Sequence, residues 1–441
     1  MLSGLFRRKI TAIFIMAFLL RITLMFVDYS FDVNNHISWG QDAFNRGLQN
    51  FYELRSKEAY GTDIPNYPPL AIFLFLPWYP IQQFLFNTFW NLNINFSFFP
   101  SNLVTFVEWR GFLAGLFKIP SILSDIGIGG MVYLFSKKIV PESIKLQTWA
   151  VLATLFNPLF LYNSALMGQI DSIPILFSLV LIYLLLYKKM PLLSVFFITL
   201  GLLTKPTVII FLPAYLYLFT QNNNWKIALK SIVVSLATFI ISFVPFLKGD
   251  NFIIYPFVTY IRRILETQSL QSVSNGALNF WSIFYPLRSV SSDAKIFPGV
   301  TFGTFAIILT VAILFLLFKY FFQKKEKNWV FIFYLTSFAC VMFLSKMHER
   351  YFIIPIVFLM LASLKYAYLR KIFYLYTVFA TINIYFLWPV PEIRWLDLFL
   401  SWPPTQILIS ILFLILFLAS TNYFFSFFLS NFSKPRPLNT K

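Results

Sequence analysis

The sequence predicts an all-α polytopic membrane protein, and three observations lead to that fold class. Of the 441 residues, 59% are hydrophobic and only 12% are charged, whereas about a quarter of the residues in an ordinary soluble domain are charged. The mean hydropathy is +0.73. Apolar runs that approach the ~20 residues needed to cross a bilayer recur along the chain. Soluble and disordered proteins are therefore excluded, and lipid is the main solvent.

The apolar runs predict about twelve transmembrane helices. Several runs are shorter than a perpendicular helix needs, so tilted or broken helices are expected there. The two runs beside Lys205 are interrupted by Pro206. The runs cover residues 10–27, 113–135, 147–167, 172–187, 191–204, 206–220, 227–247, 300–318, 329–345, 351–364, 372–389 and 405–428.

Basic residues predict the orientation of these helices. Arg7, Arg8 and Lys9 precede the first apolar run as in a signal peptide, but no small-residue cleavage site follows, so a retained first helix is expected. If this end is cytoplasmic and residues 28–112 are outside, the other basic loops fall in the cytoplasm too, in agreement with the positive-inside rule. These are Lys137 and Lys138, Lys188 and Lys189, Lys226 and Lys230, Lys324–Lys327, Arg370 and Lys371, and the C-terminal tail. The net charge of +18 then reports topology rather than nucleic-acid binding, with both termini cytoplasmic.

This layout predicts two large outer loops and three regions. Residues 1–247 form a first module that contains the outer loop 28–112, residues 248–299 form a second outer loop with an amphipathic helix, and residues 300–441 form a C-terminal membrane module. The apolar stretch 67–90 is expected to lie along the outer surface as a juxtamembrane helix, because a further crossing would invert the charge pattern. Unusual polar residues collect on the outer side, so chemistry is expected on that face.

Several polar residues on the outer side allow both a functional and a structural interpretation. Asp28 and Asp32 follow the first helix, where a fixed carboxylate suits a general base but also suits a solvated helix end. Lys205 is costly near the membrane unless it is paired, snorkels to the surface or meets an anionic head group. Gln169 and Asp171 either orient a substrate hydroxyl or cap the next helix.

Further ionisable residues allow the same two interpretations. Asp125 lies inside the second span, where Arg21, Lys118 or Lys205 is its expected partner. His348, Glu349 and Arg350 form either an anion site or an ordinary charged turn. Arg262, on the amphipathic element of the second loop, contacts either a substrate phosphate or lipid head groups. The single cysteine, Cys340, excludes an intramolecular disulfide and a cysteine metal cluster.

Four motifs occur in an order that is typical of one enzyme family. They are Asp32 with Trp39 seven positions later, Tyr67-Pro68-Pro69-Leu70, Asn279-Phe280-Trp281 and His348-Glu349-Arg350. Together they resemble the GT-C integral-membrane glycosyltransferases, and are most similar to the dolichyl-phosphate-glucose glucosyltransferases of asparagine-linked glycan assembly and their prokaryotic homologues. Asn34 and Asn35 replace the expected Glu and Gln, and Arg350 replaces a Lys. These departures leave the acceptor open.

The resemblance implies a GT-C fold and inverting transfer of a hexose, such as glucose or mannose, from a polyprenyl-phosphate-linked donor to an acceptor hydroxyl. Asp32 matches the catalytic Asp of the family. The expected donor-phosphate ligands are Lys205, His348, Arg350 and Arg262, and the expected substrate-binding residues are Trp39, Tyr67, Gln169, Asp171 and Glu349. No metal site and no cofactor are expected, since the donor is a co-substrate and no nucleotide-binding Asp-X-Asp motif is present.

The partners implied are the lipid-linked donor, membrane lipid and a glycan, glycolipid or protein acceptor, with no nucleic acid. A prokaryotic plasma membrane is favoured over the endoplasmic reticulum. Two alternatives stay open. A secondary transporter or lipid flippase would place its ionisable residues around a central cavity, and a structural subunit would need no convergent acid and base.

Overall fold

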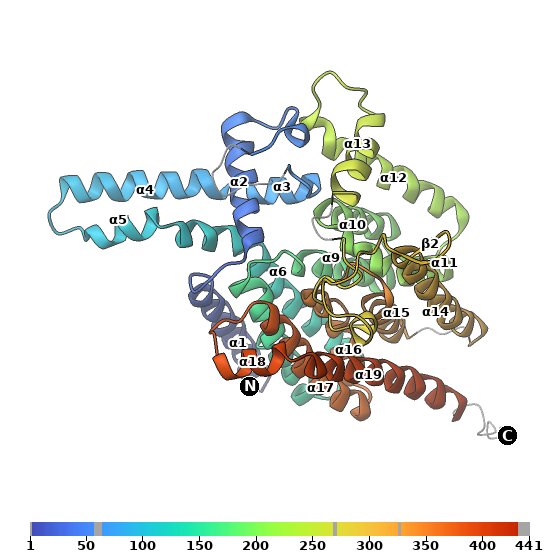
Figure 1. Ribbon diagram of the computed structural model, residues 1–441. Coiled ribbons are helices and arrows are strands. Elements are labelled where there is room, and N and C mark those ends of the chain that lie inside the picture. Colours follow the sequence, from blue (N-terminus) through green and yellow to red (C-terminus); the bar gives the residue numbers. More distant parts are fainter. Residues whose placement is uncertain (1, 57–63, 268–270, 325–327, 431–441) are drawn as a thin grey trace. The chain divides into compact units, whose positions relative to one another are not determined.

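The computed structural model describes residues 2–56, 64–267, 271–324 and 328–430 (Figure 1). The chain divides into two compact units, residues 1–269 and 270–441. Apart from the antiparallel pairing of β1 with β2, the regular structure in these ranges is helical. Residues 325–327 and the C-terminal tail 431–441, which the sequence assigns to the cytoplasmic side, lie outside the described residues.

The first unit consists of helices throughout its described part. Its N-terminal half contains α1 (Leu2–Leu24), α2 (Phe31–Arg46), η1 (Phe51–Glu53), α3 (Pro69–Phe75), α4 (Trp78–Asn95), α5 (Ser101–Glu108), α6 (Arg110–Ile139), α7 (Ile144–Leu155), α8 (Pro158–Phe160) and η2 (Leu161–Leu166). There follow α9 (Ser172–Tyr183), η3 (Leu184–Lys188), α10 (Pro191–Thr204), η4 (Pro206–Phe211), α11 (Leu212–Asn222), α12 (Trp225–Phe243), η5 (Val244–Phe246), α13 (Ile254–Thr259) and η6 (Tyr260–Leu265).

The second unit begins with an irregular segment and continues as helices. Its elements are η7 (Phe280–Ile283), β1 (Lys295–Phe297), β2 (Val300–Thr301), α14 (Phe302–Lys324), α15 (Trp329–Phe343), η8 (Glu349–Phe352), α16 (Ile353–Ser363), α17 (Ala367–Leu387), α18 (Arg394–Ser401) and α19 (Pro403–Ser430). Every residue of α15 and α16 is buried. These two apolar helices, one following the other in sequence, pack together as the core of the unit.

Among the described residues, six helical segments are long and apolar enough to cross a membrane, namely Pro69–Asn95, Arg110–Ile139, Ile144–Leu166, Trp225–Phe246, Phe302–Gln323 and Pro403–Ser426. The outer faces of α12 and α14 carry large apolar side chains, such as Val233 and Phe315, that are more than half exposed. Water does not tolerate such continuous apolar surfaces, whereas lipid does. The chain is therefore an α-helical polytopic membrane protein, as predicted. Each predicted apolar interval also overlaps a helix, or a helix extended by a 3₁₀ or π turn.

The elements of the first predicted outer loop pack directly against the helices of the first unit. Apolar side chains of α2, η1 and α3 share one core with α6 and α10, and Ile37, Tyr52, Phe75 and Phe117 in this core are completely buried. Burial of aromatic residues of this size stabilises a domain by roughly 2–3 kcal/mol each. The residues near Asp32 are thus placed on a rigid support.

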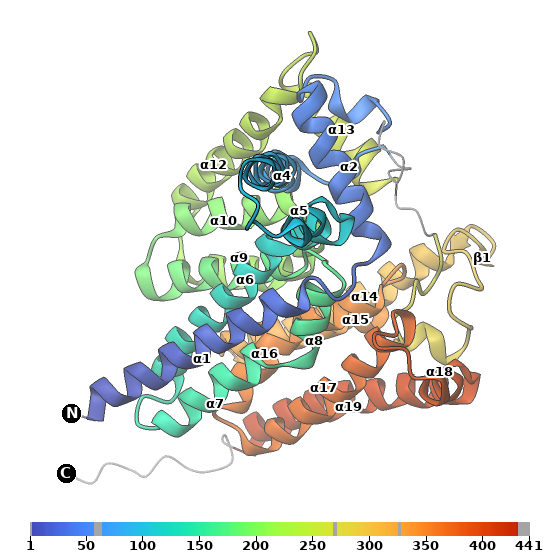
Figure 2. The same cartoon turned by 90° about the vertical axis from the view of Figure 1, so that its left-hand side faces the viewer.

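Helices α4 and α5 form an antiparallel hairpin joined by polar contacts. Gln82 donates to the carbonyl of Val107 at 2.9 Å, and Phe84 and Phe98 are 69% and 82% exposed. Length and composition alone would let α4 span a bilayer. Figure 2 shows α4 end-on, whereas α1 runs lengthwise in the same view. The hairpin therefore does not follow the direction of α1.

Candidate functional site

Asp32 lies in the first turn of α2, and this helix begins directly after the extended residue Ser30. A carboxylate is stabilised there because the N-terminal end of a helix is electropositive. The amide of Gln169 donates to Asp32 Oδ2 at 2.7 Å, across 137 positions of sequence. Hydrogen bonds to an ionised acceptor are short and strong, so this contact holds the carboxylate in one orientation. Asp32 itself is partly exposed.

The segment that carries Gln169 reaches Asp32 through a tight turn. Gly168 adopts a φ of +78°, and a Cβ atom at this position would lie 2.5 Å from Val33 Cγ2. Only glycine fits, since both the left-handed backbone and the close approach exclude a side chain. The buried Gln169 amide also donates to Ser30 Oγ at 3.1 Å, and its main-chain NH bonds the carbonyl of Asn163 at 2.9 Å.

Lys205 and Asp171 form a buried ion pair, with Lys205 Nζ 2.6 Å from Asp171 Oδ1 and side-chain exposures of 5% and 1%. Lys205 is placed by a helix break, because α10 ends at Thr204 and η4 begins at Pro206. Of the possibilities for Lys205, the structure shows pairing rather than snorkelling. Asp171 stands at the N-cap of α9 without a capping hydrogen bond, so the capping alternative is not observed.

Aromatic side chains lie beside this ion pair. Lys205 Nζ is 5.9 Å from the centroid of the Tyr67 ring, within the range of a cation–π contact. The Tyr67 ring is 5.4 Å from that of Trp39 and 5.3 Å from that of His36. His36 in turn stacks on Phe75 at 4.3 Å. His36 was not among the predicted site residues, although it precedes Trp39 by three positions and so shares its helix face.

The structure therefore brings together six predicted residues of the first unit, which we call the Asp32 cluster: Asp32, Trp39, Tyr67, Gln169, Asp171 and Lys205. Arg262 is exposed on η6. Its neighbour Arg263 forms an ion pair with Glu53 on η1 and thereby links η6 to η1, a contact in which Arg262 takes no part.

One departure from the family pattern has a visible structural role. Asn34, which replaces the expected Glu, accepts two hydrogen bonds from the guanidinium of Arg110, at 3.0 Å from Nε and 2.8 Å from Nη2. This fork joins the first turns of α2 and α6. Asn34 thus supports the helix that carries Asp32 even without a carboxylate.

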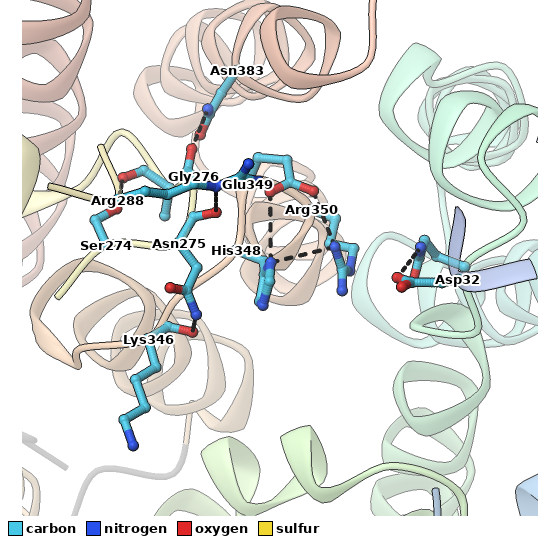
Figure 3. Close-up of polar contacts among 12 residues, drawn as sticks. Asp32, Ser274, Asn275, Gly276, Arg288, Lys346, His348, Glu349, Arg350 and Asn383 are labelled. Carbon is cyan, nitrogen blue, oxygen red and sulfur yellow. Dashed lines mark hydrogen bonds and ion pairs between the residues drawn. The ribbon is translucent and has the colours of Figure 1, made fainter. Parts of the chain in front are cut away.

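In the second unit, His348, Glu349 and Arg350 form one polar cluster (Figure 3). Arg350 Nη1 donates to Glu349 Oε1 at 3.1 Å and lies 3.4 Å from His348 Nδ1. Burial raises the pKa of Glu349, but the hydrogen bond with His348 and the charge of Arg350 outweigh it and lower the pKa to about 2. Glu349 is therefore a carboxylate at neutral pH and orients the two basic side chains.

A loop packs against this cluster through main-chain contacts. Asn275 NH bonds the carbonyl of Met347 at 3.0 Å, and Asn383 Nδ2 donates to the carbonyl of Gly276 at 2.9 Å (Figure 3). Gly276 has a φ of +139°, and a Cβ atom there would lie 2.7 Å from Glu349 Oε2. The glycine thus lets the backbone pass directly over the buried carboxylate.

The Asn279-Phe280-Trp281 motif anchors the same loop. Asn279 Oδ1 accepts from Trp281 NH at 3.1 Å, which caps the short helix η7. Trp281 Nε1 donates to the carbonyl of Phe343, the last residue of α15, at 2.8 Å. The observed role of this motif is therefore to hold the loop on the helical core.

No protein-family model matches the chain, and no curated protein matches it significantly. Within the described ranges, no group of three or more His, Cys, Asp or Glu side chains is placed to hold a metal ion. The first unit contains an oriented carboxylate, Asp32, and a lysine, Lys205, that lies beside aromatic rings. The second unit contains an oriented pair of basic side chains, Arg350 and His348. Such groups can take a proton from a hydroxyl and bind an anion.

Proposed function

We propose that the chain is an inverting GT-C glycosyltransferase that moves a hexose from a polyprenyl-phosphate donor to an acceptor hydroxyl at the outer face of a prokaryotic plasma membrane. The observation that carries this proposal is the hydrogen bond from Gln169 to Asp32, which holds a carboxylate at the start of α2. A general base must be oriented toward the proton that it removes.

In the proposed reaction, Asp32 takes the proton from the acceptor hydroxyl as its oxygen attacks the anomeric carbon. The bond from that carbon to the phosphate oxygen breaks on the opposite side, so the configuration inverts. The phosphate needs little protonation as it leaves, and one carboxylate suffices where a glycosidase uses two. In the first unit, Lys205 is the proposed phosphate-binding cation, and in the second unit His348 and Arg350 are the proposed anion-binding pair.

Each of these cations is supported by an acid. Asp171 holds Lys205, and Glu349 holds Arg350 and lies near His348. Compensation by a neighbouring carboxylate lets basic groups stay buried without substrate and keeps them oriented. Trp39 and Tyr67, beside Lys205, supply flat apolar surfaces that suit a sugar ring or the start of a prenyl chain.

The proposed topology has about twelve spans, with the α4–α5 hairpin on the outer surface. The direction of α4, which differs from that of α1, supports this placement (Figure 2). The exposed aromatic side chains of the hairpin, such as Phe98, then contact the interface between lipid and water.

The competing function is secondary transport or lipid flipping, and the buried Arg21–Asp125 pair within the helices favours it. Asp125, however, also accepts hydrogen bonds from Ser164 and Ser172. A carboxylate that is satisfied in this way suits a structural role better than a binding site that must exchange partners during transport.

Transfer of a radiolabelled hexose from a panel of polyprenyl-phosphate sugars tests the proposal, with purified protein in nanodiscs and membrane extracts as acceptors. We expect wild type to consume one donor and Asp32→Asn to be slower by about 100-fold or more. Asp250→Asn is the matched control, because Asp250 is exposed and its carboxylate accepts a hydrogen bond from the NH of Lys248, and this variant should retain transfer.

Undiminished transfer by Asp32→Asn would remove Asp32 as the base. If wild type consumes none of the donors while purified in a folded state, glycosyl transfer is refuted and transport becomes the function to test.

A further inference from the structure

Lys118 is a completely buried lysine in α6 whose hydrogen-bond partners are main-chain carbonyls. Its Nζ donates to the carbonyl oxygens of Met25 at 2.8 Å, Ala165 at 3.0 Å and Leu166 at 2.8 Å. It also donates to the carbonyl of Asp28. Four carbonyl oxygens thus surround one nitrogen, as they surround a bound monovalent cation.

This environment suits the charged ammonium form. An ammonium group has three N–H donors and no acceptor, so every contact with a carbonyl oxygen is favourable. A neutral amine would direct its lone pair at one of these oxygens. A buried charge is costly, and here the carbonyl dipoles and the charge of the Asp28 carboxylate offset that cost.

The four carbonyls come from two segments that both lead to the Asp32 cluster. Met25 and Asp28 lie in the turn between α1 and α2, a few residues before Asp32. Ala165 and Leu166 are the last residues of η2, a few residues before Gln169. Carbonyls at a helix end lack partners within the helix, and a cation there is favourable.

The stem of Lys118 packs against the turn at Gly168, which lies between η2 and Gln169. A Cβ atom on Gly168 would lie 3.0 Å from Lys118 Cγ and 2.5 Å from Val33 Cγ2. The carbonyl of Met167 accepts from Ser30 NH at 3.0 Å in the same region. Lys118 therefore contacts both sides of the junction at which Gln169 meets Asp32.

We propose that Lys118 is a positioning residue whose ammonium group acts as a tethered monovalent cation, joining residues 25–28 to residues 165–166 and thereby setting the Asp32–Gln169 hydrogen bond. The effect of Lys118 on catalysis rests on the proposed glycosyl transfer. The joining of residues 25–28 to residues 165–166 by Lys118 does not, because these contacts exist whatever reaction the protein performs.

The first experiment measures the junction without an activity assay. Hydrogen–deuterium exchange of the purified protein in nanodiscs is compared for wild type, Lys118→Ala, Lys118→Met and the control Lys138→Met, which removes an exposed lysine from the same helix. We expect both Lys118 variants to exchange faster, by about tenfold or more, at residues 25–33 and 163–171. Exchange in α12 and in the Lys138→Met control should match wild type.

The second experiment supplies the missing cation. Ammonium or methylammonium, added at tens of millimolar, should restore protection in Lys118→Ala, where space is left for it. Neither cation should restore protection in Lys118→Met, because the methionine side chain fills the space of the lysine stem. Tetramethylammonium has no N–H donors, so it should not restore protection in Lys118→Ala. Unchanged exchange at both segments in the two variants overturns the proposal, as does faster exchange along the whole chain, which indicates a general loss of stability.

The third experiment applies if wild type transfers a hexose. Lys118→Ala should then lower kcat by about tenfold or more with little change in KM, since a misplaced base affects the chemical step. Methylammonium should recover this loss in Lys118→Ala and leave Asp32→Asn unaffected. If methylammonium restores protection from exchange in Lys118→Ala but kcat stays as low as without it, Lys118 does not position the base. Absence of transfer by wild type refutes the proposed function and leaves the exchange result standing.

Discussion

Arg21 on α1 and Asp125 on α6 form a buried ion pair, with Arg21 Nε 2.9 Å from Asp125 Oδ2 and neither side chain more than 1% exposed. The sequence left three basic partners open for Asp125, and the structure selects Arg21. Hydrogen bonds from Ser164 and Ser172 to the same carboxylate join η2 and α9 to this pair. One acid thus connects four helical elements.

Removal of Asp125 alone should lower the stability of the protein more than removal of both members of the ion pair. Asp125→Leu leaves the Arg21 charge buried without its partner and should lower the free energy of unfolding by about 3–5 kcal/mol. The double variant Arg21→Met, Asp125→Leu should recover much of this loss. Thermal unfolding in nanodiscs measures both. A double variant less stable than Asp125→Leu would contradict the ion-pair explanation.

Gly168 and Gly47 offer a matched pair of substitutions. Both have a left-handed backbone, with φ of +78° and +77°, but a Cβ atom would meet Val33 at Gly168 and nothing within 4 Å at Gly47. Gly47→Ala should cost only the backbone strain, which is about 1–3 kcal/mol at its φ of 77° and ψ of −178°. Gly168→Ala should cost about 1–3 kcal/mol more from overpacking. Equal losses of melting temperature in the two variants would show that the close contact with Val33 does not add to the cost of a side chain at Gly168.

Charge at Lys205 should matter more than its exact shape. Lys205→Met removes the cation that pairs with Asp171 and with it a proposed phosphate ligand, so kcat/KM for the donor should fall by roughly 100-fold. Lys205→Arg keeps the charge and should retain more activity, with some loss because the guanidinium fits differently. If the neutral and charged variants transfer the hexose equally well, Lys205 has no electrostatic role in the reaction.

Glu349 should make stability depend on pH only in acid. Its pKa is about 2 in the folded protein against an ordinary value of 4.5, so the ionised form is favoured by folding. This stabilisation is fully present above pH 4.5 and is lost as the pH falls through about 2. The difference in melting temperature between wild type and Glu349→Gln should therefore shrink as the pH falls from 5 toward 2. A difference that stays unchanged as the pH is lowered from 5 to 3 would contradict this assignment.

The helices and part of the site followed from local features of the sequence. Apolar length predicted the helical intervals, and the Lys205-Pro206 step predicted the break between α10 and η4. The sequence indicates Gln169 and Lys205 one by one as polar residues on a predicted outer face, and it indicates Asp32 by the resemblance to the GT-C motif. Their proximity in the structure reflects packing of α2, α9 and α10 that no local pattern specifies.

Other features depend on long-range packing and were not predictable from the sequence. The partner of Asp125 is decided by which helix face α1 presents to α6, and several basic residues satisfied the local criterion. Lys118 was considered only as a partner for an acid, whereas it binds carbonyls at two helix ends. Carbonyl groups are present at every residue and leave no trace in a sequence, so such a contact has no motif.

The π-helical turn η2 contains one extra residue ahead of the candidate site. A π turn holds one more residue than an α turn, and η2 ends two residues before Gly168. Deletion of a single residue within Leu161–Leu166 would therefore leave an α turn and keep the direction of the following chain, including Gln169. Deletion of a single residue from α7 removes no extra residue and would rotate the following chain by about 100° around the helix axis. The contact between Gln169 and Asp32 should therefore tolerate the first deletion and not the second.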